Sequence, residues 1–239
     1  MTSEAPLAGR SALVTGASRG IGRQVAERLA RAGARVWCLA RSEGAVRALA
    51  AELGGEALVV DLADDLATWE ALDQMNEPLG GAPDIVVNAA GVFGIASSHT
   101  DTVKGFDESV AINLRGPFLV NRALLPAMLE RGRGLIVNVG SVAGRKALRG
   151  NAAYSASKYG LRGYHEVLLE ELRGTGVRAT LLEPGATDTP LWDPFDPDRD
   201  PRLPSREQML RPDDVAEAVL FVATRPDTVR VPLLQIERA

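Results

Sequence analysis

The chain has 239 residues, of which 46% are hydrophobic and 24% charged, the balance of an ordinary globular protein. There are 27 Lys and Arg residues against 31 Asp and Glu, and this net charge of −4 argues against nucleic acid as a partner. The sequence has a single cysteine, Cys38, which excludes an intrachain disulfide. Because it also has only two histidines, we expect no metal site. The first residues lack the apolar core of a signal peptide, and no apolar run approaches about 18 residues. We therefore expect a cytoplasmic protein without a membrane span.

Short apolar runs typical of buried strands alternate with segments of helical spacing along the chain. The predicted strands are 12–15, 35–40, 57–61, 85–88, 135–139, 177–182 and roughly 229–236. The predicted helices are 20–32, 42–53, 63–77, 106–131, 154–173 and 213–224. This alternation predicts an α/β fold, with a doubly wound parallel sheet of about seven strands and helices on both faces, in a single domain over residues 1–239.

One segment interrupts this alternation. Residues 184–212 contain seven of the 14 prolines, which excludes a long helix or a central strand there. Long loops inside compact domains are uncommon and usually functional. The apolar side chains of Leu191, Trp192 and Phe195 favour a lid over a site, at about residues 186–210. The alternative is a solvated connector.

A glycine-rich turn, TGASRGIG at 15–22, follows the first predicted strand and leads directly into a helical pattern. Glycines at 16, 20 and 22 permit a tight turn and close approach of a ligand to the backbone. The following helix N-terminus offers free N–H groups to an anion. The spacing differs from the common G-x-G-x-x-G fingerprint, but its place predicts a dinucleotide-binding turn. A purely structural turn is the alternative.

The end of the second strand bears on which dinucleotide is bound. An acidic residue there binds a ribose 2′-hydroxyl, whereas an arginine accommodates a 2′-phosphate. Ala40 occupies the acidic position and Arg41 follows it, and Arg19 within the glycine turn can reach the same phosphate. We therefore expect NADP(H) to be preferred, with NAD(H) as the alternative cofactor. The competing interpretation makes both arginines ordinary surface charges. Asp61, at the end of the third strand, either faces the adenine amino group or caps the next helix.

A tyrosine and a lysine lie four residues apart in the predicted helix 154–173, so Tyr154 and Lys158 share one helical face. An ammonium beside a phenol favours its ionised form, which predicts a lowered pKa for Tyr154. Such a phenol can give a proton to a carbonyl or take one from an alcohol. Ser141 follows the fifth strand, at the edge where parallel-sheet sites lie. An exposed i,i+4 pair is the alternative, because Y-x-x-x-K arises often by chance.

These motifs, in this order, resemble the short-chain dehydrogenase/reductase family over nearly the whole chain. The motifs are TGASRGIG at 15–22, Asp61, NAAG at 88–91, Asn113 in INLRG, Ser141 in GSVAG, YSASK at 154–158 and PGATDT at 184–189. The resemblance implies a Rossmann-type fold, oxidoreductase activity on alcohols or carbonyls, and a nicotinamide cofactor. It implies catalytic roles for Asn113, Ser141, Tyr154 and Lys158. The cofactor-binding residues that it implies are Gly16, Ser18, Arg19, Gly20, Ile21, Gly22, Arg41, Asp61, Leu62, Asn88, Ala89, Gly91, Tyr154, Lys158, Pro184, Gly185, Thr187 and Thr189.

Fewer residues indicate the substrate. We expect a mostly apolar pocket lined by Phe93, Val142, Leu148, Leu191, Trp192 and Phe195. Arg145, Lys146 and Arg149 either attract an anionic substrate or form a solvated basic turn. The favoured function is an NADP-dependent reductase or dehydrogenase acting on a small carbonyl or alcohol. The alternatives are a reductase of 3-oxoacyl thioesters on a carrier protein and a non-catalytic dinucleotide-binding sensor. The resemblance also implies a homodimer or homotetramer formed through helices 106–131 and 154–173.

Overall fold

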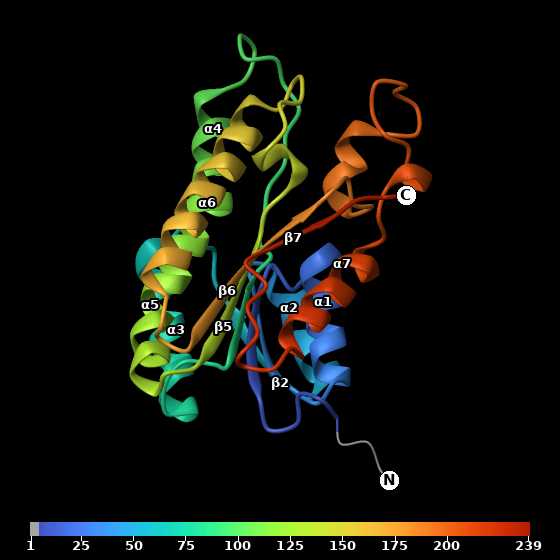
Figure 1. The fold of residues 1–239 in the computed structure, drawn as a ribbon. Coiled ribbons are helices and arrows are strands. Elements are labelled where there is room, and N and C mark those ends of the chain that lie inside the picture. The colour runs from blue at the N-terminus through green and yellow to red at the C-terminus, as the bar shows by residue number, and fades with distance from the viewer. Residues whose placement is uncertain (1–4) are drawn as a thin grey trace.

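The computed structural model describes residues 5–239 and contains a seven-stranded parallel sheet in the order β3-β2-β1-β4-β5-β6-β7 (Figure 1). The strands are β1 (Ser11–Thr15), β2 (Arg35–Ala40), β3 (Glu56–Val59), β4 (Ile85–Asn88), β5 (Gly134–Val139), β6 (Val177–Pro184) and β7 (Leu233–Ile236). The main helices are α1 (Gly20–Arg31), α2 (Glu43–Leu53), α3 (Asp65–Leu79), α4 (Val103–Val110), α5 (Gly116–Arg131), α6 (Ala152–Glu171) and α7 (Pro212–Ala223). The predicted doubly wound α/β fold is confirmed.

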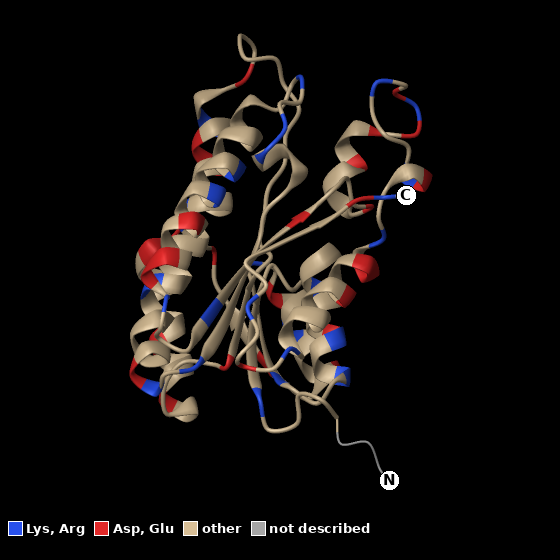
Figure 2. Ribbon diagram, viewed as in Figure 1, with Lys and Arg blue, Asp and Glu red and all other residues tan. Residues whose placement is uncertain are grey.

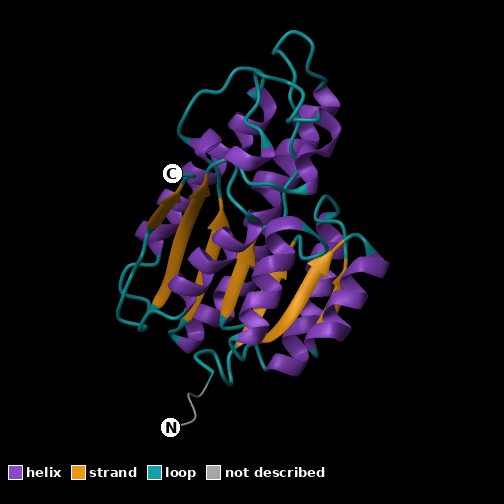
Figure 3. Ribbon diagram, turned by 90° about the vertical axis from the view of Figure 1, so that its right-hand side faces the viewer, coloured by secondary structure: helices purple, strands orange, loops and turns teal. Residues whose placement is uncertain are grey.

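Helices cover both faces of the sheet. One layer contains α1, α2 and α7, and the opposite layer contains α3, α5 and α6 (Figures 1 and 3). Neighbouring residues of one strand face opposite layers: Val14 packs toward α1 and α7, whereas Leu13 packs toward α3 and α5. Because both faces are covered, the central strands are apolar at successive positions, which is why they read as continuous apolar runs.

The predicted helix 106–131 is helical throughout but not uniformly α-helical. The structure begins α4 at Val103, inserts a π-helical turn at Ala111–Arg115, and starts α5 at Gly116. Pro117 lies in the first turn of α5. Because proline has no backbone N–H, it cannot donate a hydrogen bond to the preceding turn. The periodic apolar pattern runs through this interruption, so periodicity alone predicted a single helix. Two predicted strands are also shorter than expected, because β3 ends at Val59 and β7 begins at Leu233.

Short turns of 3₁₀ helix break up the proline-rich segment, at Pro190–Phe195 and Arg206–Gln208. Its two ends are joined by a bridge between Thr187 and Leu210. Inside it, Arg206 forms ion pairs with Asp188, with Asp193 at 2.7 Å and with Asp198 at 3.9 Å. The segment is therefore an ordered loop with internal ion pairs and a bridge between its two ends. Its role as a lid stays a prediction.

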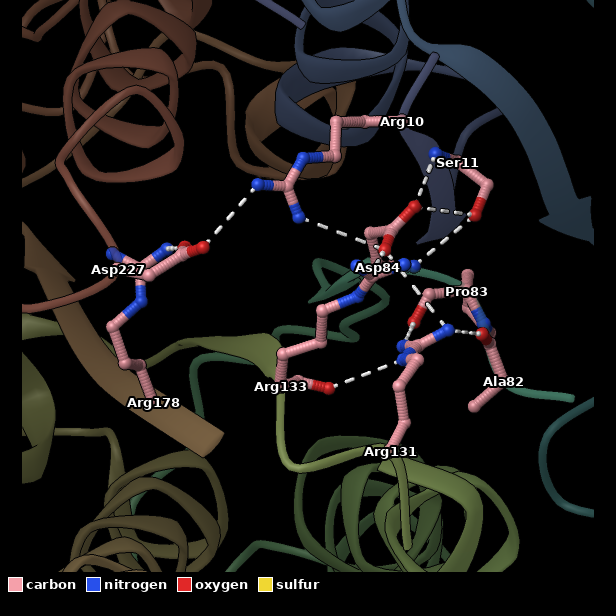
Figure 4. Close-up of polar contacts among 9 residues, drawn as sticks. All are labelled: Arg10, Ser11, Ala82, Pro83, Asp84, Arg131, Arg133, Arg178 and Asp227. Atoms are coloured by element: carbon pink, nitrogen blue, oxygen red, sulfur yellow. Dashed lines mark hydrogen bonds and ion pairs between the residues drawn. The ribbon is translucent and has the colours of Figure 1, made fainter. Parts of the chain in front are cut away.

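The amino ends of the strands are joined around Asp84, which directly precedes β4 (Figure 4). The Asp84 Oδ2 atom accepts hydrogen bonds from the backbone N–H of Ser11 at 2.9 Å and from its hydroxyl at 3.2 Å. The Asp84 carbonyl accepts from Leu135 N at 2.9 Å, and the guanidinium groups of Arg10 and Arg133 lie 3.7 and 3.8 Å from Oδ1. Asp84 therefore ties β1, β4 and β5 together, through its carboxylate and its backbone carbonyl, at the edge opposite the strands' carboxyl ends.

Acidic and basic residues are interspersed along the helices of both layers (Figure 2). Within residues 5–239, every helix is too short or too polar to cross a bilayer. In the same range, no three His, Cys, Asp or Glu side chains come together in the way a metal site requires.

Candidate active site

A cleft of about 380 Å³ lies at the carboxyl ends of the central strands. It brings together residues of the glycine turn with residues that follow β2, β3 and β4. Of the predicted cofactor-binding residues, the cleft is lined by Gly16, Ser18, Arg19, Gly20, Ile21, Gly22, Arg41, Asp61, Leu62, Ala89, Gly91 and Thr189. Parallel sheets place ligand sites at this edge, as the fold predicts.

The glycine turn is built so that side chains are excluded. A Cβ on Gly16 would lie 2.7 Å from Ala90 Cα, and one on Gly22 would lie 2.4 Å from the Gly16 carbonyl oxygen. Gly16 also has φ of 70°, a conformation that favours glycine. The first turn of α1 carries no acidic residue, and the side chain of Arg19 does not cap it. Its free N–H groups and bare backbone fit the phosphates of a dinucleotide.

The structure places an acidic residue beside the arginine expected to hold a 2′-phosphate. Arg41 and Asp61 both line the cleft, and Arg41 Nη1 lies 3.8 Å from Asp61 Oδ2. The turn after β3 therefore returns to the end of β2 and brings a carboxylate beside Arg41. The helix-capping alternative for Asp61 is wrong, because Asp64 caps α3 by accepting from Ala67 N at 3.0 Å.

Six predicted cofactor residues lie outside the cleft lining, and two of them, Tyr154 and Lys158, belong to the catalytic group described below. The Asn88 side chain is buried and donates 2.9 Å hydrogen bonds to Asn121 and Asn138, since β4 sets Asn88 opposite Asn138 on β5. Pro184 is the last residue of β6, and Gly185 N donates to Ile236 O beyond it. These residues, with Thr187, support the carboxyl ends of the strands around the cleft.

The predicted catalytic side chains come from two neighbouring segments. Ser141 follows β5 and caps the short helix Val142–Gly144 by accepting from Ala143 N at 3.1 Å. Tyr154 and Lys158 are one turn apart on α6, and the Lys158 ammonium lies 5.8 Å from the centre of the Tyr154 ring. Lys158 Nζ donates to the Val139 carbonyl oxygen at 2.8 Å, in a buried position. The structure therefore brings Ser141, Tyr154 and Lys158 together.

Burial dominates the ionisation of this group. It raises the pKa of the Tyr154 phenol above its usual value, against a smaller lowering effect of the hydrogen bond with Ser141. It lowers the pKa of Lys158 to about 8. The predicted lowering of the Tyr154 pKa by Lys158 is therefore wrong for this structure. The ammonium bonds to the Val139 carbonyl instead of the phenol, and desolvation opposes phenolate formation.

Asn113 sits in the π-helical turn and is completely buried. Its side chain accepts from Val92 N at 2.8 Å, donates to Val92 O at 3.0 Å and donates to Ser157 Oγ at 3.0 Å. It therefore fastens the chain after β4 to the face of α6 that carries the catalytic residues. The irregular turn gives Asn113 this position.

Aromatic side chains gather beside Tyr154. The ring of Phe93 lies 5.0 Å from Tyr154, 4.9 Å from Trp192 and 5.4 Å from Phe195, measured between centroids. Of the other predicted substrate residues, Val142 begins the turn after Ser141 and Leu191 lines the cleft. Leu148 is separate, because it lines a different surface hollow with Arg149 and Tyr159.

Some cleft residues were missed from the sequence. Large apolar side chains also line the cleft, among them Leu39, Val60, Val92 and Ile112. In the sequence these residues are marked only by their position next to strand ends and motifs. An apolar residue at such a position cannot be distinguished by sequence from a residue of the hydrophobic core. The basic residue Arg145 was expected either to attract substrate or to be solvated. The structure instead pairs it with Glu183 and Glu237.

Comparison with known proteins agrees with this geometry. The sequence profile of the short chain dehydrogenase family matches residues 10–200. The chain is 37% identical to the D-threitol dehydrogenase of Mycolicibacterium smegmatis, over 91% of this chain and 87% of that protein. A metagenomic short-chain oxidoreductase in complex with NADP is 35% identical, with a TM-score of 0.83 and coverage of 98% and 99%. The closed form of a serine dehydrogenase complexed with NADP⁺ is 32% identical, with a TM-score of 0.87 and coverage of 95% and 94%.

These matches extend well beyond the glycine turn and cover the catalytic segments as well as the nucleotide half of the sheet. A shared fold alone leaves activity open, but the relatives are named for the same class of reaction at identities above 30%. The chain belongs to the short-chain dehydrogenase/reductase family and is an oxidoreductase that uses a nicotinamide dinucleotide.

Proposed function

We propose that the protein is an NADP(H)-dependent carbonyl reductase or alcohol dehydrogenase in which Tyr154 is the general acid and base. The observation that carries this proposal is the convergence of Ser141, Tyr154 and Lys158 beside the aromatic group. A non-catalytic sensor has no need for this combination of side chains. All three are present, and they lie on segments that meet.

The ionisation of the site suits carbonyl reduction. When bound, the dinucleotide supplies the hydride. Because burial raises the pKa of Tyr154, the phenol stays protonated at neutral pH and can donate its proton to the substrate oxygen. The Ser141 hydroxyl donates a hydrogen bond to the same oxygen as negative charge develops there. We propose that the Lys158 ammonium holds the ribose hydroxyls of the cofactor beside Tyr154, and that Asn113 holds a water on the route that restores the proton.

The preference for NADP(H) rests on two arginines that line the cleft, Arg19 and Arg41. A hydrogen bond between charged partners contributes about 1.5–3 kcal/mol. We therefore expect Arg41→Ser to weaken NADPH binding about 10- to 100-fold while NADH binding changes less than threefold. Arg47→Ser is the matched control, since Arg47 is exposed on α2, pairs with Glu43 and is not part of the cleft lining. Equal losses for NADPH and NADH, read by fluorescence titration, would remove Arg41 from the 2′-phosphate site.

We propose that the substrate presents an apolar or aromatic group to Phe93, Trp192 and Phe195. Edge-to-face contacts with a substrate ring are favourable in such surroundings. The proposed lid, residues 186–210, contributes two of these three side chains. Arg145 is occupied by two carboxylates, so it leaves no free charge for an anionic substrate.

The test is NADPH oxidation measured against aromatic ketones, aliphatic ketones, aldehydes, diketones and 3-oxoacyl thioesters. We expect the aromatic ketones and diketones to be reduced fastest. Tyr154→Phe should lower kcat at least 100-fold and weaken NADPH binding far less, because it removes the proton donor and keeps the rest of the ring. Activity that survives this substitution would refute the mechanism. Activity confined to the thioesters would identify the alternative carrier-protein substrate.

We also propose that the protein forms a homodimer or homotetramer through α5 and α6. The outer faces of these helices expose large apolar side chains, Phe118 and Leu129 on α5 and Val167 on α6. Contiguous exposed apolar residues mark association surfaces in soluble proteins. A monomer in light scattering at micromolar concentration would refute this proposal.

A further inference from the structure

A buried carboxylate lies at the carboxyl end of β6, close to the catalytic segments. Glu183 is 1% exposed. Its two oxygens accept from Arg162 Nη1 at 3.0 and 3.2 Å, and one of them also accepts from Gln235 Nε2 at 2.9 Å. Arg145 Nε lies 3.4 Å from the same carboxylate. A buried charge with this many partners is expensive to break from one side.

The two arginines come from the two segments that carry the catalytic groups. Arg145 directly follows the short helix that Ser141 caps. Arg162 lies on α6, one helical turn beyond Lys158. Glu183 is therefore a charge that both segments share, and Gln235 adds β7 to the same cluster.

Each arginine also has an outer carboxylate of its own. Arg162 bonds Glu166 at 3.0 Å, and Arg145 pairs with Glu237. Both outer carboxylates are more than half exposed, so solvent screens them. If Glu183 lost its charge, each arginine would keep a surface partner but lose its link to β6.

Packing around the cluster leaves little room for adjustment. A Cβ on Gly144 would lie 2.9 Å from the Lys158 carbonyl oxygen, so the turn after Ser141 rests directly on α6. A Cβ on Gly140 would lie 3.3 Å from Glu183 Cγ, so the residue before Ser141 rests on the carboxylate side chain. A small movement of Glu183 would therefore also displace the loop after β5 and helix α6.

We propose that Glu183 is a positioning residue that fixes the loop 141–145 and helix α6 relative to each other. In this role it sets the approach of Ser141 to Tyr154 and Lys158 without contacting the reacting atoms. The inference rests on the proposed function, because it assigns Glu183 to that same reaction. Displacements of about 1 Å in a catalytic group can lower a rate by about 100-fold.

The test is Glu183→Gln, which keeps the size of the side chain and removes its charge. We expect kcat for the best carbonyl of the panel to fall 10- to 100-fold, while NADPH binding, read by fluorescence, stays within twofold. Hydrogen–deuterium exchange should rise in peptides covering 141–150 and 152–163. Glu183→Asp keeps the charge on a shorter stem and should recover part of the lost kcat. The control Glu166→Gln removes only an exposed partner of Arg162 and should match the wild type.

A structural role alone would give a different result. If Glu183→Gln lowers only the melting temperature, with kcat and exchange in both peptides unchanged, the proposal is wrong. If the variant does not fold, Arg145→Gln releases one arm and should raise exchange in 141–150 alone; unchanged exchange there would also overturn the proposal. If the wild type reduces no carbonyl of the panel, the proposed function fails, and the exchange comparison by itself decides the role of Glu183.

Discussion

The buried position of Lys158 predicts a pH-dependent cost to stability that substitution should remove. The side chain is 5% exposed, and burial lowers its pKa from 10.5 to about 8. The folded protein therefore resists carrying a charge that the unfolded chain accepts freely. We expect Lys158→Met, which keeps the length of the side chain and cannot ionise, to change the pH dependence of unfolding.

The magnitude follows from the two pKa values. They differ by about 2.5 pH units, and about 1.4 kcal/mol corresponds to each, so the cost is about 3 kcal/mol below pH 8. Between pH 8 and 10.5 the unfolded chain binds a proton that the folded protein lacks, and wild-type stability rises with pH. The methionine variant does not follow this rise. Its loss of the hydrogen bond to Val139 O costs about 1–3 kcal/mol at every pH.

Urea unfolding of the protein without cofactor, at several values between pH 7 and pH 10, measures this difference. We expect the stability of Lys158→Met relative to wild type to fall by about 2–3 kcal/mol across that range. Lys104→Met is the control, because Lys104 is exposed on α4 and should show no such trend. A difference between Lys158→Met and wild type that stays constant from pH 7 to pH 10 would refute the reasoning.

Two further predictions concern opposite edges of the sheet. Gly22→Ala should weaken NADPH binding at least tenfold in a fluorescence titration, because its Cβ would meet the Gly16 carbonyl at 2.4 Å. The control Gly44→Ala, which meets nothing within 4 Å, should bind NADPH normally. Asp84→Asn should lower the free energy of unfolding by about 1–3 kcal/mol, because it leaves nearby guanidinium groups without their shared carboxylate (Figure 4). Thermal unfolding measures this as a fall of about 2–4 °C per kcal/mol, and an unchanged melting temperature would contradict it.

The strands were predictable where burial on both faces made the pattern continuous. The predicted bounds 35–40 and 85–88 are those of β2 and β4. The predicted helix 106–131 is helical throughout, but its pattern did not show the π-helical turn at Ala111–Arg115. The Asn113 side chain forms hydrogen bonds with Val92 and Ser157, which are distant in sequence. The π-helical turn that carries Asn113 lies within a stretch whose apolar residues keep a helical spacing. Local pattern carries no information about such partners.

The site was predictable at the level of segments and less so at the level of side-chain partners. The glycine turn had to lie at a strand end, so its contribution to the cleft followed from order along the chain. The pairing of Arg41 with Asp61 did not, because it depends on how β3 returns beside β2. The cluster around Glu183 joins four segments and left no sequence signal beyond one acidic residue in an apolar strand.

The ionisation of Tyr154 shows most directly where sequence reasoning stops. Spacing of four residues correctly placed Lys158 on the same helical face, and from this a lowered phenol pKa was inferred. That inference omitted desolvation, which acts on both groups and disfavours both charges. Carbonyl reduction requires the protonated phenol of Tyr154 as its proton donor. Because burial keeps this phenol protonated, it favours the form of the enzyme that is active in reduction. Alcohol oxidation requires the phenolate, and we expect it to become faster relative to reduction as the pH is raised.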